Sequence, residues 1–133
     1  MNNSKITFAL LRLLNFIIDT LAIFLLTVLI LNWIIYPFTN ELTLSLKRLI
    51  EILVLIFIHF EYYGILEYKY QKTIGKILTK TKVVTKDGTR PRLKYILIRT
   101  IVRLIVIVDQ ISYLFKKNGL HDRLSGTTVI KEK

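Results

Sequence analysis

The sequence predicts an all-α integral membrane protein with two transmembrane helices and a third membrane-embedded helical segment. Its 133 residues are 53% hydrophobic and have a mean hydropathy of +0.49, yet the formal net charge is +11. The apolar residues form long runs and the basic residues lie between them, a pattern typical of membrane segments joined by cationic loops. The length suits one domain, residues 1–133.

The first predicted transmembrane helix covers residues 8–36. Trp33 and Tyr36 suit the aromatic belt at a membrane interface, and Pro37 ends the helix. The run is too long for the core of a signal peptide, so we expect it to be a retained span. It carries two charges, Arg12 and Asp19, which lie seven residues apart on one helical face.

The second predicted transmembrane helix covers residues 49–68. Its length suits a bilayer core about 30 Å thick. Four ionisable side chains interrupt it: Glu51, His59, Glu61 and Glu67.

Residues 69–94 form the most basic part of the chain, with nine Lys or Arg residues and one acid, Asp87. The positive-inside rule places this segment in the cytoplasm, and the N-terminus with it. The β-branched stretch at residues 78–86 predicts a strand, and Asp87-Gly88 indicates a hairpin turn. Because Pro91 limits a returning strand to an edge, we expect a small cytoplasmic β-hairpin patch.

The third helical segment is predicted at residues 95–117, followed by a basic tail at 118–133. A full span would put the tail outside, against the positive-inside rule, whereas a re-entrant or interfacial helix would keep it in the cytoplasm. We expect the cytoplasmic tail, with residues 127–130 as a strand that could pair with residues 81–85. Spanning, re-entrant and interfacial forms all remain open for the helix.

The candidate site residues in the membrane are charged. Asp19 lies roughly 16 Å into the first helix, near the midplane, while Arg12 is close enough to the cytoplasmic end to reach the headgroups. A charge at that depth costs roughly 2.5–3.5 kcal/mol on insertion scales, so Asp19 needs a partner or serves as a proton or cation site. Arg99 and Arg103, one turn apart, are the best candidates to meet it. They could instead pair with acids of the second helix or with lipid phosphates.

Other kinds of site have weak support. The chain has no cysteine, and neither histidine has a second one at ligand spacing, so we expect no metal site and no cofactor. His59 with Glu67 could form a proton relay, but Glu61 lies off their face. The basic segment lacks the aromatic interleaving of a nucleic-acid binder. No catalytic motif is present, so we expect no enzymatic activity.

Taken in order, a set of short motifs covers nearly the whole chain: Arg12-x6-Asp19, Tyr62-Tyr63, Glu67, Thr73-Ile-Gly-Lys76, Val83-Val84, Asp87-Gly88, Arg99, Arg103 and His121-Asp122-Arg-Leu-Ser-Gly-Thr127. With these residues the chain resembles the RDD family of small membrane proteins. His121 stands where glycine is commoner, and Ser125 where alanine or another small residue is usual.

The resemblance implies that Asp122 is the second aspartate of the family and that the tail is docked, with Asn118-Gly119 as a helix C-cap that returns Asp122 to the cytoplasmic surface. It also implies a membrane role, for which cation/proton exchange has been suggested in some members.

Two functions follow as expectations. One is cation- or proton-coupled transport by an oligomer, with Asp19 as the titrating group. The other is a non-transporting accessory or scaffold protein that binds anionic lipid headgroups or a partner membrane complex. Either suits a multi-pass protein of the inner membrane, as a homo-oligomer or beside another membrane protein, and neither involves nucleic acid.

Overall fold

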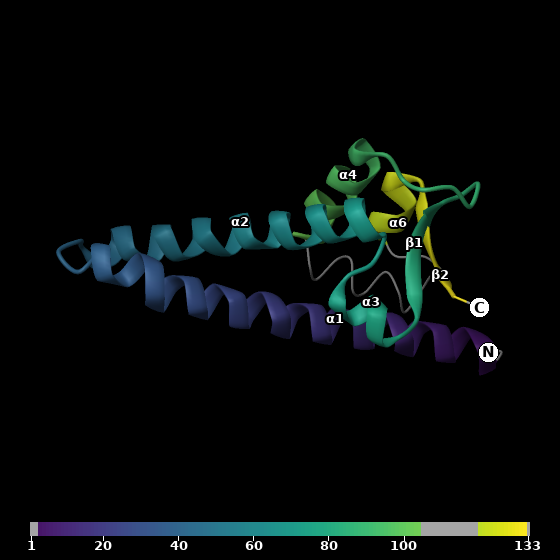
Figure 1. Ribbon diagram of the computed structural model, residues 1–133, viewed down its shortest axis with the longest axis horizontal. Helices are drawn as coiled ribbons and strands as arrows, with labels where there is room; N and C mark the ends of the chain where they lie inside the picture. The colour runs from purple at the N-terminus through teal and green to yellow at the C-terminus, as the bar shows by residue number, and fades with distance from the viewer. Residues whose placement is uncertain (1–2, 105–119, 133) are drawn as a thin grey trace.

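The computed structural model describes residues 3–104 and 120–132. Two long helices form an antiparallel helical hairpin, and all other described elements gather at its open end with both chain ends (Figure 1). The helices are α1 (Asn3–Ile30) and α2 (Leu44–Tyr70). Both are long and apolar enough to cross a membrane, over Ala9–Phe38 and Leu44–Tyr70. Together with a small two-stranded sheet, they bear out the mostly helical fold that the sequence predicts.

The connection between the two helices is compact. α1 continues into a π-helical turn, η1 (Leu31–Ile35), and a 3₁₀ turn, η2 (Tyr36–Phe38). Pro37 lies inside η2, where its fixed φ suits the first residues of a turn. α2 begins at Leu44, five residues earlier than predicted, and ends at Tyr70. The next residue, Gln71, is a left-handed C-cap with φ of 59°, and its amide donates to the Glu67 carbonyl at 3.0 Å.

We call the elements at the open end the cap: α3 (Ile74–Leu78), β1 (Thr81–Thr85), α4 (Leu93–Arg103), α6 (Leu120–Ser125) and β2 (Thr127–Lys131). α3 packs against α1, α4 packs against α2, and α6 packs against α4. The cap therefore holds the open ends of both hairpin helices.

The sheet confirms one prediction and corrects another. β1 pairs antiparallel with β2, with Val83 opposite Val129, as expected for the tail strand. The predicted β-hairpin, in which residues 78–86 would pair with the chain just after Asp87-Gly88, was wrong. The Asp87-Gly88 turn does form, since the Gly88 amide donates to the Thr85 carbonyl at 3.0 Å, but the chain after it leads into α4 and contributes no strand.

Only the first part of the predicted third segment falls in the described structure. α4 covers Leu93–Arg103, and the predictions for the rest of residues 95–117 and for the Asn118-Gly119 cap lie outside the described residues.

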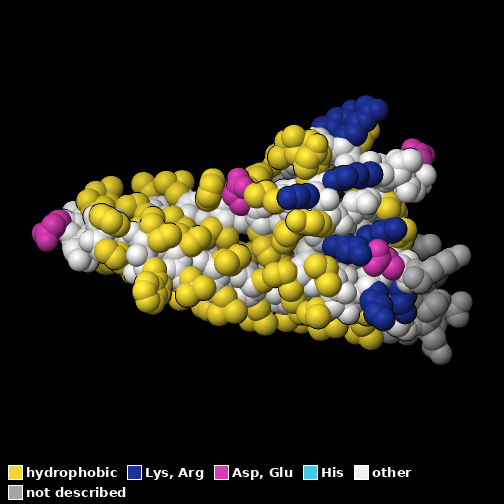
Figure 2. Space-filling view, viewed as in Figure 1, with side chains coloured by type: hydrophobic (Ala, Val, Ile, Leu, Met, Phe, Trp, Pro, Cys, Tyr) yellow, Lys and Arg dark blue, Asp and Glu magenta, His cyan; other side chains and the backbone are white. Residues whose placement is uncertain are grey.

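The molecule places apolar side chains outside and polar ones inside. Hydrophobic side chains cover the length of the hairpin, while Lys and Arg gather at the cap (Figure 2). Exposed examples include Phe24 at 60%, Leu29 at 55% and Phe57 at 65%. The fully buried side chains include Asp19, Glu67, Arg99 and Asp122. This reversal is expected for helices whose outer surface meets lipid.

Candidate functional site

The buried face of α1 is polar in its first half. Arg12, Asn15 and Asp19 recur every three or four residues, so they lie on one side of the helix. They are 5%, 4% and 1% exposed. Further along the same face, Ile23 packs with Ile58 and the two tyrosines of α2 in a small apolar cluster. The polar half of this face lies under the cap.

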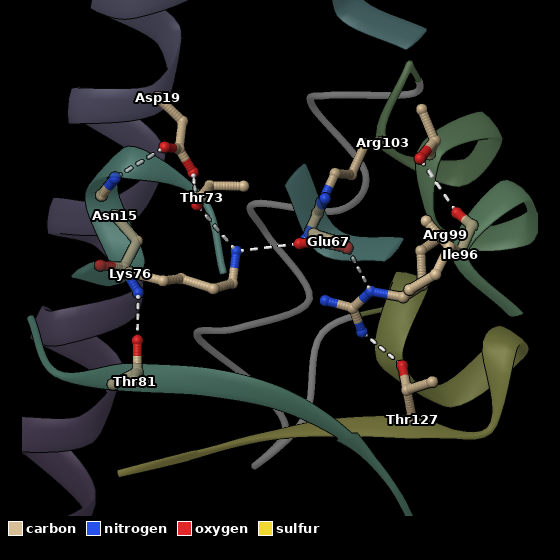
Figure 3. A network of polar contacts seen from close by, with 12 residues as sticks. Asn15, Asp19, Glu67, Thr73, Lys76, Thr81, Ile96, Arg99, Arg103 and Thr127 are labelled. Atoms are coloured by element: carbon tan, nitrogen blue, oxygen red, sulfur yellow. Dashed lines mark hydrogen bonds and ion pairs between the residues drawn. The ribbon is translucent and has the colours of Figure 1, made fainter. Parts of the chain in front are cut away.

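Asp19 is held by three uncharged donors. The Tyr62 hydroxyl donates to Oδ1 at 2.7 Å, the Thr73 hydroxyl to Oδ2 at 2.7 Å, and the Gly75 amide to Oδ1 at 2.9 Å. Thr73 precedes α3 and Gly75 lies in its first turn, so α3 supplies two of the donors (Figure 3). The carboxylate therefore ties α1 to both α2 and α3.

Gly75 permits the close approach of α3 to α1. A Cβ at this position would lie 2.6 Å from the backbone oxygen of Asn15 and 2.9 Å from its Cα. The Asn15 side chain continues the contact, since its Nδ2 donates to Thr81 at 3.2 Å and its Oδ1 accepts from the Thr79 hydroxyl at 2.5 Å. Only a residue without a side chain fits between the two helices.

Glu67 collects three cations. Its Oε1 accepts from Lys76 Nζ at 3.0 Å and from Arg103 Nη2 at 2.8 Å, and its Oε2 accepts from Arg99 Nε at 3.1 Å. Glu67 is 0% exposed, and the guanidinium of Arg103 lies 4.1 Å from the centre of the Tyr63 ring. One carboxylate of α2 thus binds both α3 and α4 (Figure 3).

Asp122 joins the tail to this network. Its Oδ2 lies 2.8 Å from Nη1 of Arg12, and its Oδ1 accepts from Arg99 Nη1. The same Arg99 nitrogen donates to the Thr127 hydroxyl at the start of β2. Arg99 therefore connects α2, α6 and β2.

The charges of the network are unequal among the described residues. Arg12, Lys76, Arg99 and Arg103 contribute four positive charges, against three carboxylates on Asp19, Glu67 and Asp122. Burial lowers the pKa of the Lys76 amine, and Arg103 and Arg99 act in the same direction, whereas Glu67 and Asp19 raise it. The pKa of Lys76 is lowered overall, because burial disfavours its ammonium form more than the neighbouring carboxylates favour it.

Two expectations about these residues were wrong. Arg12 does not reach lipid headgroups, because its side chain is buried against Asp122. Asp19 is not met by Arg99 or Arg103, because α3 inserts against α1 and its donors occupy the carboxylate. Of the acids left open as partners for the two arginines, Glu67 is the one that they contact. The docked Asp122 is confirmed, although it lies buried and not at the surface.

Glu51 and Glu61 lie apart from the network, whereas His59 lies beside it, next to Arg103 and the backbone of Thr100. Glu51 accepts a hydrogen bond from the Tyr36 hydroxyl at 2.8 Å near the closed end of the hairpin. His59 is partly buried, with its ring edge-on to Tyr63 at 4.8 Å. Glu61 is exposed on the opposite side of α2. Within the described residues, no group of three His, Cys, Asp or Glu side chains is placed to hold a metal ion.

Several network residues were missed as functional candidates. Tyr62, Thr73, Lys76 and Thr127 all belong to motifs that carry the family resemblance, so the motif spacing was the signal that could have found them. Lys76 lies in the lysine-rich segment 69–94, where residue type alone does not distinguish it from its neighbours. Asn15 had no signal except its position between Arg12 and Asp19 on one face.

The network residues from Arg12 to Asp122 lie within the part of the chain that a family model matches. The model of the RDD family matches residues 7–126. The chain belongs to the RDD family. Family membership and the two apolar helices together indicate a membrane protein. No curated protein and no solved structure matches the chain.

Proposed function

We propose that this RDD protein is a non-transporting accessory or scaffold protein of the inner membrane, in which the polar network fixes the cap on a transmembrane hairpin. The observation that carries the proposal is the triple engagement of Glu67, whose two oxygens bind Lys76, Arg99 and Arg103 within 3.1 Å. Because these partners belong to α3 and α4, the carboxylate of Glu67 holds both helices against α2. Removing one partner of a buried ion pair is strongly destabilising, which is the behaviour of a structural clamp.

The proposed orientation places the cap in the cytoplasm. The basic residues of the segment 69–94 lie in or beside the cap, and short cationic segments remain on the cytoplasmic side. Trp33 and Phe38, 80% and 85% exposed, would then anchor the closed end at the outer interface. Exposed Arg92 and Lys94 at the start of α4 can contact anionic headgroups, each worth about 1 kcal/mol.

A second candidate function is cation- or proton-coupled transport with Asp19 as the titrating group. The observation that favours it is the set of partners of Asp19, all of them uncharged. Such a carboxylate can lose or gain a proton, or exchange it for a cation, without breaking an ion pair. Because the described chain has only two helices able to span a bilayer, a transport path would require an oligomer.

One pair of measurements separates the two functions. The scaffold role predicts that liposomes containing the protein hold a pH gradient when Na⁺ or K⁺ is added, and that Asp19→Asn lowers the amount of folded protein. Transport predicts dissipation of the gradient, lost in a stable Asp19→Asn variant. Flux by the wild-type protein that Asp19→Asn abolishes without loss of folding would refute the scaffold role. No enzymatic activity belongs to either proposal.

A further inference from the structure

Glu61 is a charged side chain on the outer, apolar face of α2. It is exposed, and it forms no hydrogen bond or ion pair within the part of the chain that the structure describes. Its exposed neighbours on the same face are apolar or aromatic: Phe57 at 65%, Ile65 at 51% and Tyr68 at 46%. Hydrophobic side chains cover the hairpin around this face (Figure 2). Among the described residues, the carboxylate therefore has no hydrogen-bond or ion-pair partner on a face where lipid is expected.

In the membrane orientation proposed above, the position of Glu61 along α2 places its carboxylate within the hydrocarbon region. It lies eight residues before Lys69 and thirteen after Arg48, the basic residues toward each end of the helix, or about 12 Å and 20 Å at 1.5 Å per residue. Its neighbour Tyr62 binds Asp19, so it shares the level of the buried acid. Side chains of a helix lean toward its N-terminus, which for Glu61 is the direction away from the nearer, cap-side interface. An ionised group here is costly without a partner.

We propose that Glu61 marks a docking face for a transmembrane helix of another membrane protein, one that carries a Lys or Arg at the matching depth. Charge complementarity selects this partner, because a carboxylate in hydrocarbon is best matched by a cation. Beside Glu61, a Cβ on Gly64 would meet no atom within 4 Å. Because Gly64 has no side chain and no atom lies above it, a partner helix can approach the backbone of α2 closely beside the carboxylate.

The described residues of a second copy of this chain do not supply that cation. A second copy in the same membrane orientation would present, at the depth of Glu61, the residues that lie near Asp19 and Tyr62. The cations closest to this level in the described residues, Lys76, Arg99 and Arg103, are buried and bound to Glu67. The exposed basic residues of the hairpin, such as Arg48 and Lys69, lie toward its two ends. This inference rests on the proposed accessory role and names the partner.

The test is association in vesicles with a synthetic leucine-rich transmembrane peptide that has one lysine placed about 12 Å from its cytoplasmic end. Because the chain has no cysteine, a single Lys86→Cys substitution in the exposed turn of the cap takes a donor dye, and the peptide carries the acceptor. We expect the lysine peptide to bind about 5- to 30-fold more tightly than the same peptide with leucine, the ratio given by polar contacts of about 1–2 kcal/mol between membrane helices.

Glu61→Gln and Glu61→Leu should each reduce the affinity of the lysine peptide to that of the leucine peptide. Glu41→Gln, which removes an exposed acid from the loop between α1 and α2, is the matched control and should leave the ratio unchanged. Equal binding of the two peptides by the wild-type protein would overturn the inference. So would self-association of the protein, without peptide, that Glu61→Gln abolishes, since the occupant would then be a second copy.

The two proposals fail separately. If the peptides bind equally while Glu67→Gln still unfolds the cap, the partner is wrong and the scaffold role stands. If the peptide ratio holds but the wild-type protein dissipates a pH gradient through Asp19, the docking face stands and the scaffold role falls.

Discussion

Replacing Glu67 by Gln tests whether the ion-paired network holds the cap in place. The side chains of Glu67, Lys76, Arg99 and Arg103 are 0%, 4%, 0% and 10% exposed, so water cannot replace the lost carboxylate. Removing one partner of a buried pair typically costs about 3–5 kcal/mol. We expect the lower end of that range, about 3 kcal/mol, because the Gln carbonyl still accepts one hydrogen bond and Arg99 keeps Asp122 and Thr127.

The assay is the free energy of unfolding of the cap in mixed micelles, followed by proteolysis of the cap along a denaturant series. Fluorescence of Trp33, at the closed end of the hairpin, reports separately on the hairpin. Glu61→Gln is the matched control, since it makes the same chemical change on the same helix at an exposed residue without contacts in the described structure. We expect the control to change stability by no more than about 0.5 kcal/mol. Equal stability of the two variants would refute the assignment of Glu67 as the clamp of the cap.

Three further predictions use the same assay. Lys76→Met should cost less than Glu67→Gln and should partly rescue it, because Glu67 keeps Arg99 and Arg103 and because burial disfavours the ammonium of Lys76; a loss as large as that of Glu67→Gln would contradict this. Gly75→Ala should cost about 1–3 kcal/mol because its Cβ would clash with the Asn15 backbone, whereas Gly64→Ala should be neutral or stabilising by up to about 1 kcal/mol; the reverse order would show that α3 is not seated as described. Asp19→Asn should cost about 1–3 kcal/mol, since the amide keeps one acceptor oxygen and its nitrogen replaces an oxygen that accepts a hydrogen bond; unchanged stability would remove Asp19 from the network.

The sequence predicts the parts of this fold that follow from periodicity and composition. Both long helices, the strand at residues 81–85 and its pairing with the tail are of this kind. The need of Asp19 for buried partners also follows, because a charge in an apolar run must be satisfied. Arg99 and Arg103 were correctly placed on one face of a helix, which is a property of local spacing alone.

The choice of partners did not follow from the sequence. α3 has five residues, too few for a hydrophobic period to reveal it. Once α3 lies against α1, its hydroxyl and amide groups occupy Asp19, and the arginines of α4 are left for Glu67. Lys76 shows the same limit, because composition and periodicity do not mark which lysine of the basic segment folding buries; only its place in the Thr73-Ile-Gly-Lys76 motif distinguishes it. Helical spacing gives the face of a residue but not the element that covers it.

The reversed polarity of the molecule explains why charges hold the cap. Lipid chains are as apolar as leucine, so apolar contacts between membrane helices bring little hydrophobic gain. The apolar cluster around Ile23 and Ile58 can therefore align the hairpin without fixing the cap. Carboxylates and guanidinium groups have no comparable partner in lipid, and each satisfies its hydrogen bonds in few geometries. The position of the cap thus depends on Glu67 and Asp122, while the two long helices depend on the bilayer, so the cap can be lost while the hairpin remains inserted.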